Sequence, residues 1–251
     1  DGALAGTDTD GIRIDSASVV LTDETLLDTN DALAYGDPAT AAANGDILLT
    51  GGTVSSSPAW DHGLSIDSGL NSVDLTGVTL TNLDYLNVNS ESTAAIAAVT
   101  VDDGADNPYD TAPAEMGVQI EADGGLTLHG DIQTNGGPGT TDGDVLLTAD
   151  VTLNTDITID TDLNGTDGDV TVTGSIAATT ANTEGLTIDA GTANVDLQGD
   201  VGNSVTNPQF LDITSSGTVD LENVVVGEYI DVATAATLNL NQGLYEQTLT
   251  T

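Results

Sequence analysis

The 251-residue sequence predicts an all-β fold, and within that class a single β-solenoid of about ten coils over residues 1–251. Apolar and polar residues alternate over short runs, which is the period of a strand with one buried face. These runs recur along the chain, and the composition is rich in Asp and Gly, which favour turns, but contains no Lys. Together these observations predict many short strands separated by tight turns.

The repeating unit reads apolar-x-apolar, a few small or polar residues, and apolar-x-apolar again. Its clearest starting points are residues 118, 145, 170, 186, 211 and 230, most of them 19 to 27 residues apart, which suits one coil of a solenoid. Coils stacked at the usual interstrand spacing of about 4.8 Å would form a rod on the order of 50 Å long. The paired runs lie at 64–66 and 73–75, 118–120 and 126–128, 145–147 and 151–153, 186–188 and 195–197, 211–213 and 219–221, and 230–232 and 238–240.

A longer repeat is superimposed on this unit. The stretch "GLSIDSGLNSVDLTGV" at 63–78 returns as "GLTIDAGTANVDLQGDV" at 185–201, with matching residues 122 positions apart. We expect the two stretches to form the same coil in two related halves, about 1–116 and 117–251. In the second copy we expect Leu186, Ile188, Val195 and Leu197 inside, Asp189 and Asp196 outside, and Gly191 and Gly199 at bends.

Two tandem immunoglobulin-like β-sandwiches of about 125 residues each are the alternative fold, because that is a normal size for such a domain. Two features weigh against them. The offset drifts from 122 at Leu64 and Leu186 to 128 at Leu83 and Leu211, as insertions in single coils would produce, and the short unit repeats within each half.

The net charge of the chain restricts the classes of partner that it can bind. The sequence has 41 acidic residues against one Lys or Arg, Arg13, which gives a formal net charge of −40. Binding phosphates needs basic side chains, so we expect neither nucleic acid nor an anionic membrane surface as a partner. No apolar run is long enough to predict membrane insertion. The absence of Cys excludes disulfides and thiolate chemistry.

The runs "GDVTVTGSIAATTANTEGLTIDAGTANVDLQGDV" and "LDITSSGTVDLENV" resemble the secreted β-strand-repeat proteins of bacteria, of the filamentous haemagglutinin-like adhesin type. The resemblance consists of short T-x-D, G-x-V-x-L and D-G-D motifs that recur along nearly the whole chain. It implies a right-handed parallel β-helix, export to the extracellular cell surface, and a role in adhesion or matrix formation. It carries over no catalytic residue.

Both ends of the sequence continue the strand pattern. The last residues, "LNLNQGLYEQTLTT", followed by the first, "DGALAGTDTDGIRIDSASVVL", resemble the internal run at 126–153. We therefore expect self-association into an extracellular fibre, as a head-to-tail filament or as tandem repeats of a longer chain.

Calcium is the cofactor for which the sequence offers a candidate site. The stretch 160–169 places Asp160, Asp162 and Asn164 at alternate positions, with Asp167 and Asp169 following, in the manner of the opening of a calcium loop. The twelfth position of the loop is Thr171 rather than Glu. Aspartate is also a good turn residue, and turn chemistry alone is the interpretation that the sequence favours over calcium binding.

The sequence gives little support for catalysis or for a transition-metal site, and we expect that the protein is not an enzyme. A calcium- or glycan-binding surface module is the alternative to a structural role, and a polysaccharide-degrading enzyme is the third possibility. Two acids at a suitable distance occur by chance among 41, and a polyanionic sugar substrate would be repelled. His62 and His129 lack metal-ligand spacing. Trp60, Tyr109 and Tyr35 lie in longer connections, at 54–63, 102–116 and 28–46, where they would stack on glycans or another cell surface, or pack against the rod.

Overall fold

The computed structural model describes residues 11–29, 45–57, 59, 62–102, 117–135, 143–162, 167–203, 205–215, 217–242 and 244–246. All regular elements in these ranges are β-strands. Among the described residues, no helix is long and apolar enough to cross a membrane. The predicted all-β class is confirmed.

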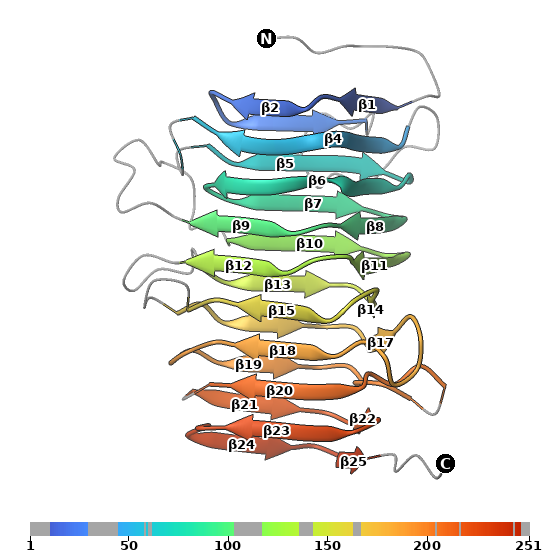
Figure 1. Ribbon diagram of the computed structural model, residues 1–251, viewed down its shortest axis with the longest axis vertical. Coiled ribbons are helices and arrows are strands. Elements are labelled where there is room, and N and C mark those ends of the chain that lie inside the picture. Colours follow the sequence, from blue (N-terminus) through green and yellow to red (C-terminus); the bar gives the residue numbers. More distant parts are fainter. Residues whose placement is uncertain are drawn as a thin grey trace.

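Every strand pairing within the described ranges is parallel. The pairings arrange the strands in three columns, which we call the first, second and third ladder, and the chain visits them in that order. One circuit through the three ladders is one coil, and each strand is a rung of its ladder. The coils stack along the longest axis of the molecule (Figure 1).

The first ladder contains β1 (Ile12–Asp15), the first part of β4 (Ile47–Ser56), the first part of β6 (Val73–Leu83), β8 (Thr93–Ile96), β11 (Gly125–Leu128), β14 (Val151–Leu153), β17 (Ile176–Ala178), the bridge residue Val201, β22 (Val224–Val226) and β25 (Leu244–Glu246). The second contains β2 (Ser18–Leu21), the later parts of β4 and β6, β9 (Val99–Asp102), β12 (Ile132–Asn135), β15 (Ile157–Asp160), β18 (Leu186–Asp189), β20 (Phe210–Thr214) and β23 (Tyr229–Ala233). The third contains β3 (Thr25–Asp28), β5 (Leu64–Gly69), β7 (Leu86–Ser90), β10 (Val118–Ala122), β13 (Val145–Thr148), β16 (Val170–Val172), β19 (Val195–Leu197), β21 (Thr218–Leu221) and β24 (Thr237–Leu240).

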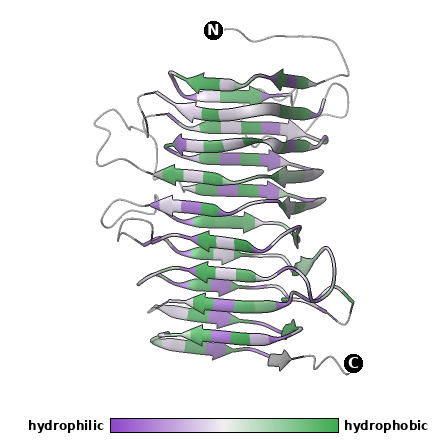
Figure 2. Cartoon of the chain, viewed as in Figure 1, coloured by the Kyte–Doolittle hydropathy of each residue, from purple (hydrophilic) through white to green (hydrophobic). Residues whose placement is uncertain are grey.

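The core is the space that the ladders enclose. Apolar and polar residues alternate along the strands (Figure 2), and the apolar ones point inward and stack on their counterparts in the next coil. In the third ladder, Val170, Val195 and Val219 occupy successive rungs and are at most 1% exposed. The predicted inside positions Leu186, Ile188, Val195 and Leu197 are likewise buried, while Asp189 and Asp196 are partly exposed.

The purely parallel pairing overturns the alternative of two immunoglobulin-like sandwiches, which are built from antiparallel sheets. The ladders also run without a break across the boundary near residue 116, because β10 pairs with both β7 and β13.

The expectation that the two echoed stretches form the same coil position is wrong. Leu64 begins β5 in the third ladder, whereas Leu186 begins β18 in the second. Likewise, the predicted starting points 118, 145 and 170 belong to the third ladder, and 186, 211 and 230 to the second. The reason is that all three ladders are built from the same apolar-x-apolar pattern, so the pattern alone does not tell which ladder a strand joins.

Close contact between successive coils restricts which residues can occupy the corners. A Cβ atom added to Gly199 would lie 2.2 Å from the carbonyl oxygen of Gly174 in the preceding coil. Gly191, expected at a bend, has a φ of +49°, a left-handed conformation that glycine adopts easily. The expected bends at Gly191 and Gly199 are thus positions where a side chain is strained or excluded.

Candidate functional site

The residues predicted to bind calcium lie at the corner between β15 and β16. Asp160 is the last residue of β15, and its carboxylate accepts a hydrogen bond from the backbone N–H of Asp162 at 3.0 Å. The carboxyl groups of Asp162 and Asp167 lie close enough for each to affect the pKa of the other. Asn164 lies outside the described residues, so its place in the predicted site stays a prediction.

The Asp162 and Asp167 carboxyl groups differ in acidity. The hydrogen bond to Asp167 is the largest of several influences that raise the pKa of Asp162, followed by burial and by the negative charge of Asp167. Burial also raises the pKa of Asp167, but hydrogen bonds from the hydroxyl and backbone N–H of Thr192 outweigh it, and the net pKa is lowered. At this corner Asp162 is therefore the carboxyl group that holds a proton more readily.

Asp169 takes part in a different arrangement, one that joins neighbouring coils. Its carboxylate accepts hydrogen bonds from the backbone and side-chain N–H groups of Asn194, 2.7 and 3.1 Å away. Asp144, in the preceding coil, accepts from the N–H of Asp169, and Asn194 accepts from the N–H of Thr218 in the following coil. The three side chains form a continuous series of hydrogen bonds along the edge of the third ladder.

The same arrangement recurs at other corners. Each acceptor lies directly before an inward-facing apolar residue, and its partner lies one coil further on. The bonds join Asp46 to Ser72, Asp131 to Thr158, Asp150 to Ser175, and Asp156 to Gly185. Many aspartates of this sequence thus satisfy backbone N–H groups between coils. The sequence signal is the repeated Asp before Ile or Val, which the sequence alone does not distinguish from turn chemistry.

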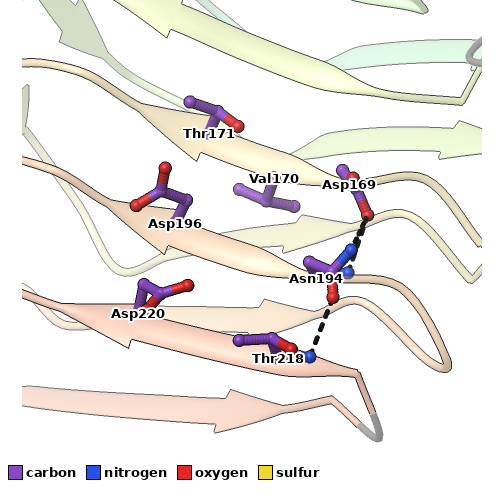
Figure 3. Close-up of a pocket in the computed structure, with 7 residues that line it drawn as sticks. All are labelled: Asp169, Val170, Thr171, Asn194, Asp196, Thr218 and Asp220. Atoms are coloured by element: carbon purple, nitrogen blue, oxygen red, sulfur yellow. Dashed lines mark hydrogen bonds between the residues drawn. The ribbon is translucent and has the colours of Figure 1, made fainter. Parts of the chain in front are cut away.

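An open acidic depression lies on the outer side of the third ladder (Figure 3). Asp169, Asn194 and Thr218 form one edge, and Asp196 and Asp220 occupy neighbouring rungs. Thr171 and Val170 complete the lining. Asp220 also accepts a hydrogen bond from Asn239 at 2.6 Å, and Asp196 accepts one from Gln198 at 2.8 Å. Oxygen atoms dominate this surface, so it can attract hydrated cations.

The described part of the chain contains no group of three or more His, Asp or Glu side chains placed to hold a metal ion together. Asp160, Asp162 and Asp167 lie at one corner of the coil, whereas the carboxylate of Asp169 accepts hydrogen bonds from Asn194. The calcium site remains a prediction from the sequence.

The remaining candidate residues are separated. The ring Nδ1 of His129 lies 3.0 Å from the side-chain nitrogen of Asn154, and His62 lies just before β5, so the two histidines belong to different corners. Trp60, Tyr35 and Tyr109 lie outside the described residues.

One aromatic feature was not expected. The rings of Phe210 and Tyr229, on successive rungs of the second ladder, stack with centroids 5.3 Å apart and planes at 4°. The Phe210 ring covers Gly185, where a Cβ atom would lie 2.2 Å from it. Phe210 and Tyr229 are far apart in the sequence, so only the register of the strands reveals the stack.

The chain matches no protein-family model, no curated protein and no solved structure. Fold and surface chemistry therefore carry the functional argument.

Proposed function

We propose that the chain is a right-handed parallel β-helix of about ten coils that serves as a structural unit of an extracellular fibre or surface adhesin. The described residues form nine circuits through the three ladders and the first strand of another. A right-handed path is the usual hand of a crossover between parallel strands. The units stack head-to-tail, or follow one another as tandem repeats.

The observation that carries this proposal is the exposure of apolar side chains in the last rung of the third ladder. Leu238 and Leu240 are 41% and 46% exposed, although they continue the inward positions of Val219 and Leu221, which are fully buried. Covering these side chains takes another rung of the same ladder. The edges of β23 and β24 also offer backbone groups that pair on one side only among the described strands.

Electron microscopy and light scattering test the proposal. Purified protein in concentrated salt, which screens the net charge of −40, is expected to give rods longer than one unit. A monodisperse particle of about 25 kDa at all salt and protein concentrations would contradict it.

A calcium- or glycan-binding surface module is the second candidate, and the acidic depression of the third ladder together with the Asp162–Asp167 pair favours calcium. Calcium bound there would offset repulsion between acidic side chains on stacked rungs. Calorimetry in millimolar calcium, compared with chelator, tests this candidate: an increase in melting temperature supports it, and an unchanged temperature overturns it.

Neither candidate involves catalysis, and the extracellular location is part of the proposal. Both candidates fit a surface that carries one Lys or Arg, Arg13, and therefore one site for trypsin-like proteases.

A further inference from the structure

Several corners of the coil are closed by a hydroxyl group. Directly after β15, the Thr161 hydroxyl donates a 2.6 Å hydrogen bond to the carbonyl oxygen of Gly168, two residues before β16 begins. The backbone N–H of Gly168 also donates to the carbonyl oxygen of Thr161, 3.4 Å away. We call a hydroxyl–carbonyl pair of this kind a clasp, because it joins the two ends of the connection that lies between its partners.

Four connections between described strands have a clasp within one coil, and these connections differ widely in length. The residues between the hydroxyl donor and the carbonyl acceptor number 2, 6, 8 and 15. In that order, the pairs are Ser68–Asn71, Thr161–Gly168, Thr134–Gly143 and Thr29–Gly45. The same contact therefore closes a tight turn and connections several times longer.

The clasp partners occupy fixed places relative to the core. Thr161 lies two residues beyond Ile159, the last buried apolar residue of its strand. Gly168 lies two residues before Val170, the first buried apolar residue of the next strand. The side chains of Thr161 and Ser68 are themselves fully buried. A buried hydroxyl group without a partner costs free energy, so the bond to the carbonyl oxygen holds the donor in place.

Neighbouring coils fix the same two ends. The backbone N–H of Thr161 donates to the carbonyl oxygen of Asp189 in the following coil at 2.8 Å. A Cβ atom at Gly168 would lie 2.1 Å from the carbonyl oxygen of Gly143 in the preceding coil, so these two acceptor residues are in close contact. The clasp and the stack thus hold both ends of the connection, whatever its length.

We infer that the clasped corners are insertion sites, at which this protein carries segments of different length while the coils keep their register. This inference goes beyond the proposed function, and it applies to a single copy of the chain. The entropy of closing a loop between fixed ends rises only with the logarithm of its length, so a longer connection costs little more than a short one. The clasp supplies the fixed ends.

The two echoed stretches compare a turn that has a clasp with one that lacks it. Ser68 and Ala190 occupy equivalent places in these stretches. Each is followed by a glycine with positive φ, +55° at Gly69 and +49° at Gly191. In both turns a backbone N–H three residues on donates to the carbonyl oxygen of this residue, at 3.2 and 2.8 Å. The turns therefore share a backbone geometry, and only the first has a hydroxyl group to form a clasp.

The carbonyl oxygen at the second turn is able to accept a clasp. The Ala193 carbonyl oxygen accepts a 2.6 Å hydrogen bond from the Ser215 hydroxyl of the following coil. At the first turn, the Asn71 carbonyl oxygen accepts from Ser90 of the following coil at 2.8 Å and from Ser68 as well. A carbonyl oxygen has two lone pairs, so one bond does not prevent the other.

An inserted segment at the Ser68 corner tests the inference. Eight Gly and Ser residues are placed between Gly69 and Leu70, which is 46% exposed, with and without Ser68→Ala. With Ser68 in place, we expect this longer connection to lower the melting temperature by about 5 °C or less. Ser68→Ala is expected to cost about 2–4 °C more with the segment than without it, because the short turn holds its own ends and the long connection depends on the clasp.

The reverse change at the second turn is the matched control. The same segment is placed between Gly191 and Thr192, and Ala190→Ser is expected to recover about 2–4 °C of the loss while changing the protein without the segment little. Each comparison is made at one corner. Losses that the segment causes through other contacts, such as that of Thr192 with Asp167, therefore cancel.

Circular dichroism and hydrogen exchange complete the test. Alanine occupies the equivalent place at Ala190, so we expect Ser68→Ala to fold. The inference requires that the amides of β5 and β6 stay protected from exchange when the segment is present at the Ser68 corner. Loss of that protection with Ser68 in place overturns it. An effect of Ser68→Ala that is the same with and without the segment also overturns it, whatever Ala190→Ser does.

Discussion

Two successive rungs of the third ladder, β21 and β24, carry nearly the same sequence, TVDL and TLNL, in different surroundings. In β21 the inward residues Val219 and Leu221 are fully buried, because coils lie on both sides. In β24 the equivalent Leu238 and Leu240 have a coil on one side only and are nearly half exposed. Burial in this molecule is therefore supplied by neighbouring coils rather than by the coil itself.

The largest expected effect compares these two rungs directly. Leu221→Ala removes a side chain from a filled interior, and we expect it to lower the free energy of unfolding by about 2–5 kcal/mol. Leu240→Ala is the matched control, and in isolated units it is expected to cost about 1 kcal/mol or less, since its side chain is already half exposed. Chemical denaturation of both variants measures the difference. Equal losses would show that the two rungs have the same surroundings in solution.

A second variant tests how closely interior coils approach each other at a corner. Gly199→Ala places a Cβ atom 2.2 Å from the Gly174 carbonyl oxygen, so the backbone must shift. We expect a loss of about 1–3 kcal/mol in chemical denaturation. Gln198→Ala, at the exposed neighbouring position, is the control and is expected to be nearly neutral. If Gly199→Ala were equally neutral, the coils would not be in close contact there.

A third pair of variants compares two classes of aspartate. Asp150 accepts hydrogen bonds at 2.8 Å from the backbone N–H and hydroxyl of Ser175 in the next coil. We expect Asp150→Ala to cost about 1 kcal/mol, as for loss of a capping side chain. Asp196, beside Asp220, accepts from the side chain of Gln198, and Asp196→Ala is expected to be neutral or slightly stabilising at low salt. Thermal unfolding of both variants at low salt decides whether the two classes differ.

The smallest expected effect concerns pH. The raised pKa of Asp162 means that ionising it opposes folding, so Asp162→Asn is expected to raise the melting temperature slightly at neutral pH. That gain disappears as pH falls below about 4, where the carboxyl group is protonated in the unfolded chain too. Asp167 has a lowered pKa, and its contribution is present above the usual Asp range and lost as pH falls through the folded value.

Asp167→Asn should therefore lower the melting temperature at neutral pH. The two substitutions are predicted to act in opposite directions, and melting curves between pH 3 and 7 compare them. The same sign for both at neutral pH would contradict the assignment of the proton to Asp162.

The strand pattern was predictable from sequence, but the ladder of each strand was not. Leu186 and Ile188 are buried as their alternation indicates. Leu64 matches Leu186 in sequence yet belongs to another ladder, because each ladder imposes the same demand for alternate apolar residues. Connections of variable length then remove any fixed period that would tell the ladders apart.

The candidate site shows the same limit. That Asp169 precedes a strand is visible in the sequence, but its partner Asn194 is fixed only by the register of β16 and β19. The Phe210–Tyr229 stack depends in the same way on the pairing of β20 and β23. Local chemistry was thus predictable where it serves one strand, and not where it joins two coils.

The strands lie across the long axis, so the hydrogen bonds between coils run along it (Figure 1). A pulling force along that axis acts directly on these bonds, and the coils separate one at a time rather than all together. From Val145 to Val170 a coil has 25 residues, and once released it spans about 80–90 Å instead of a single interstrand spacing. The half-buried last coil would yield first. Such a stack lengthens stepwise under load, absorbing work with each coil, and shortens again when the coils re-form.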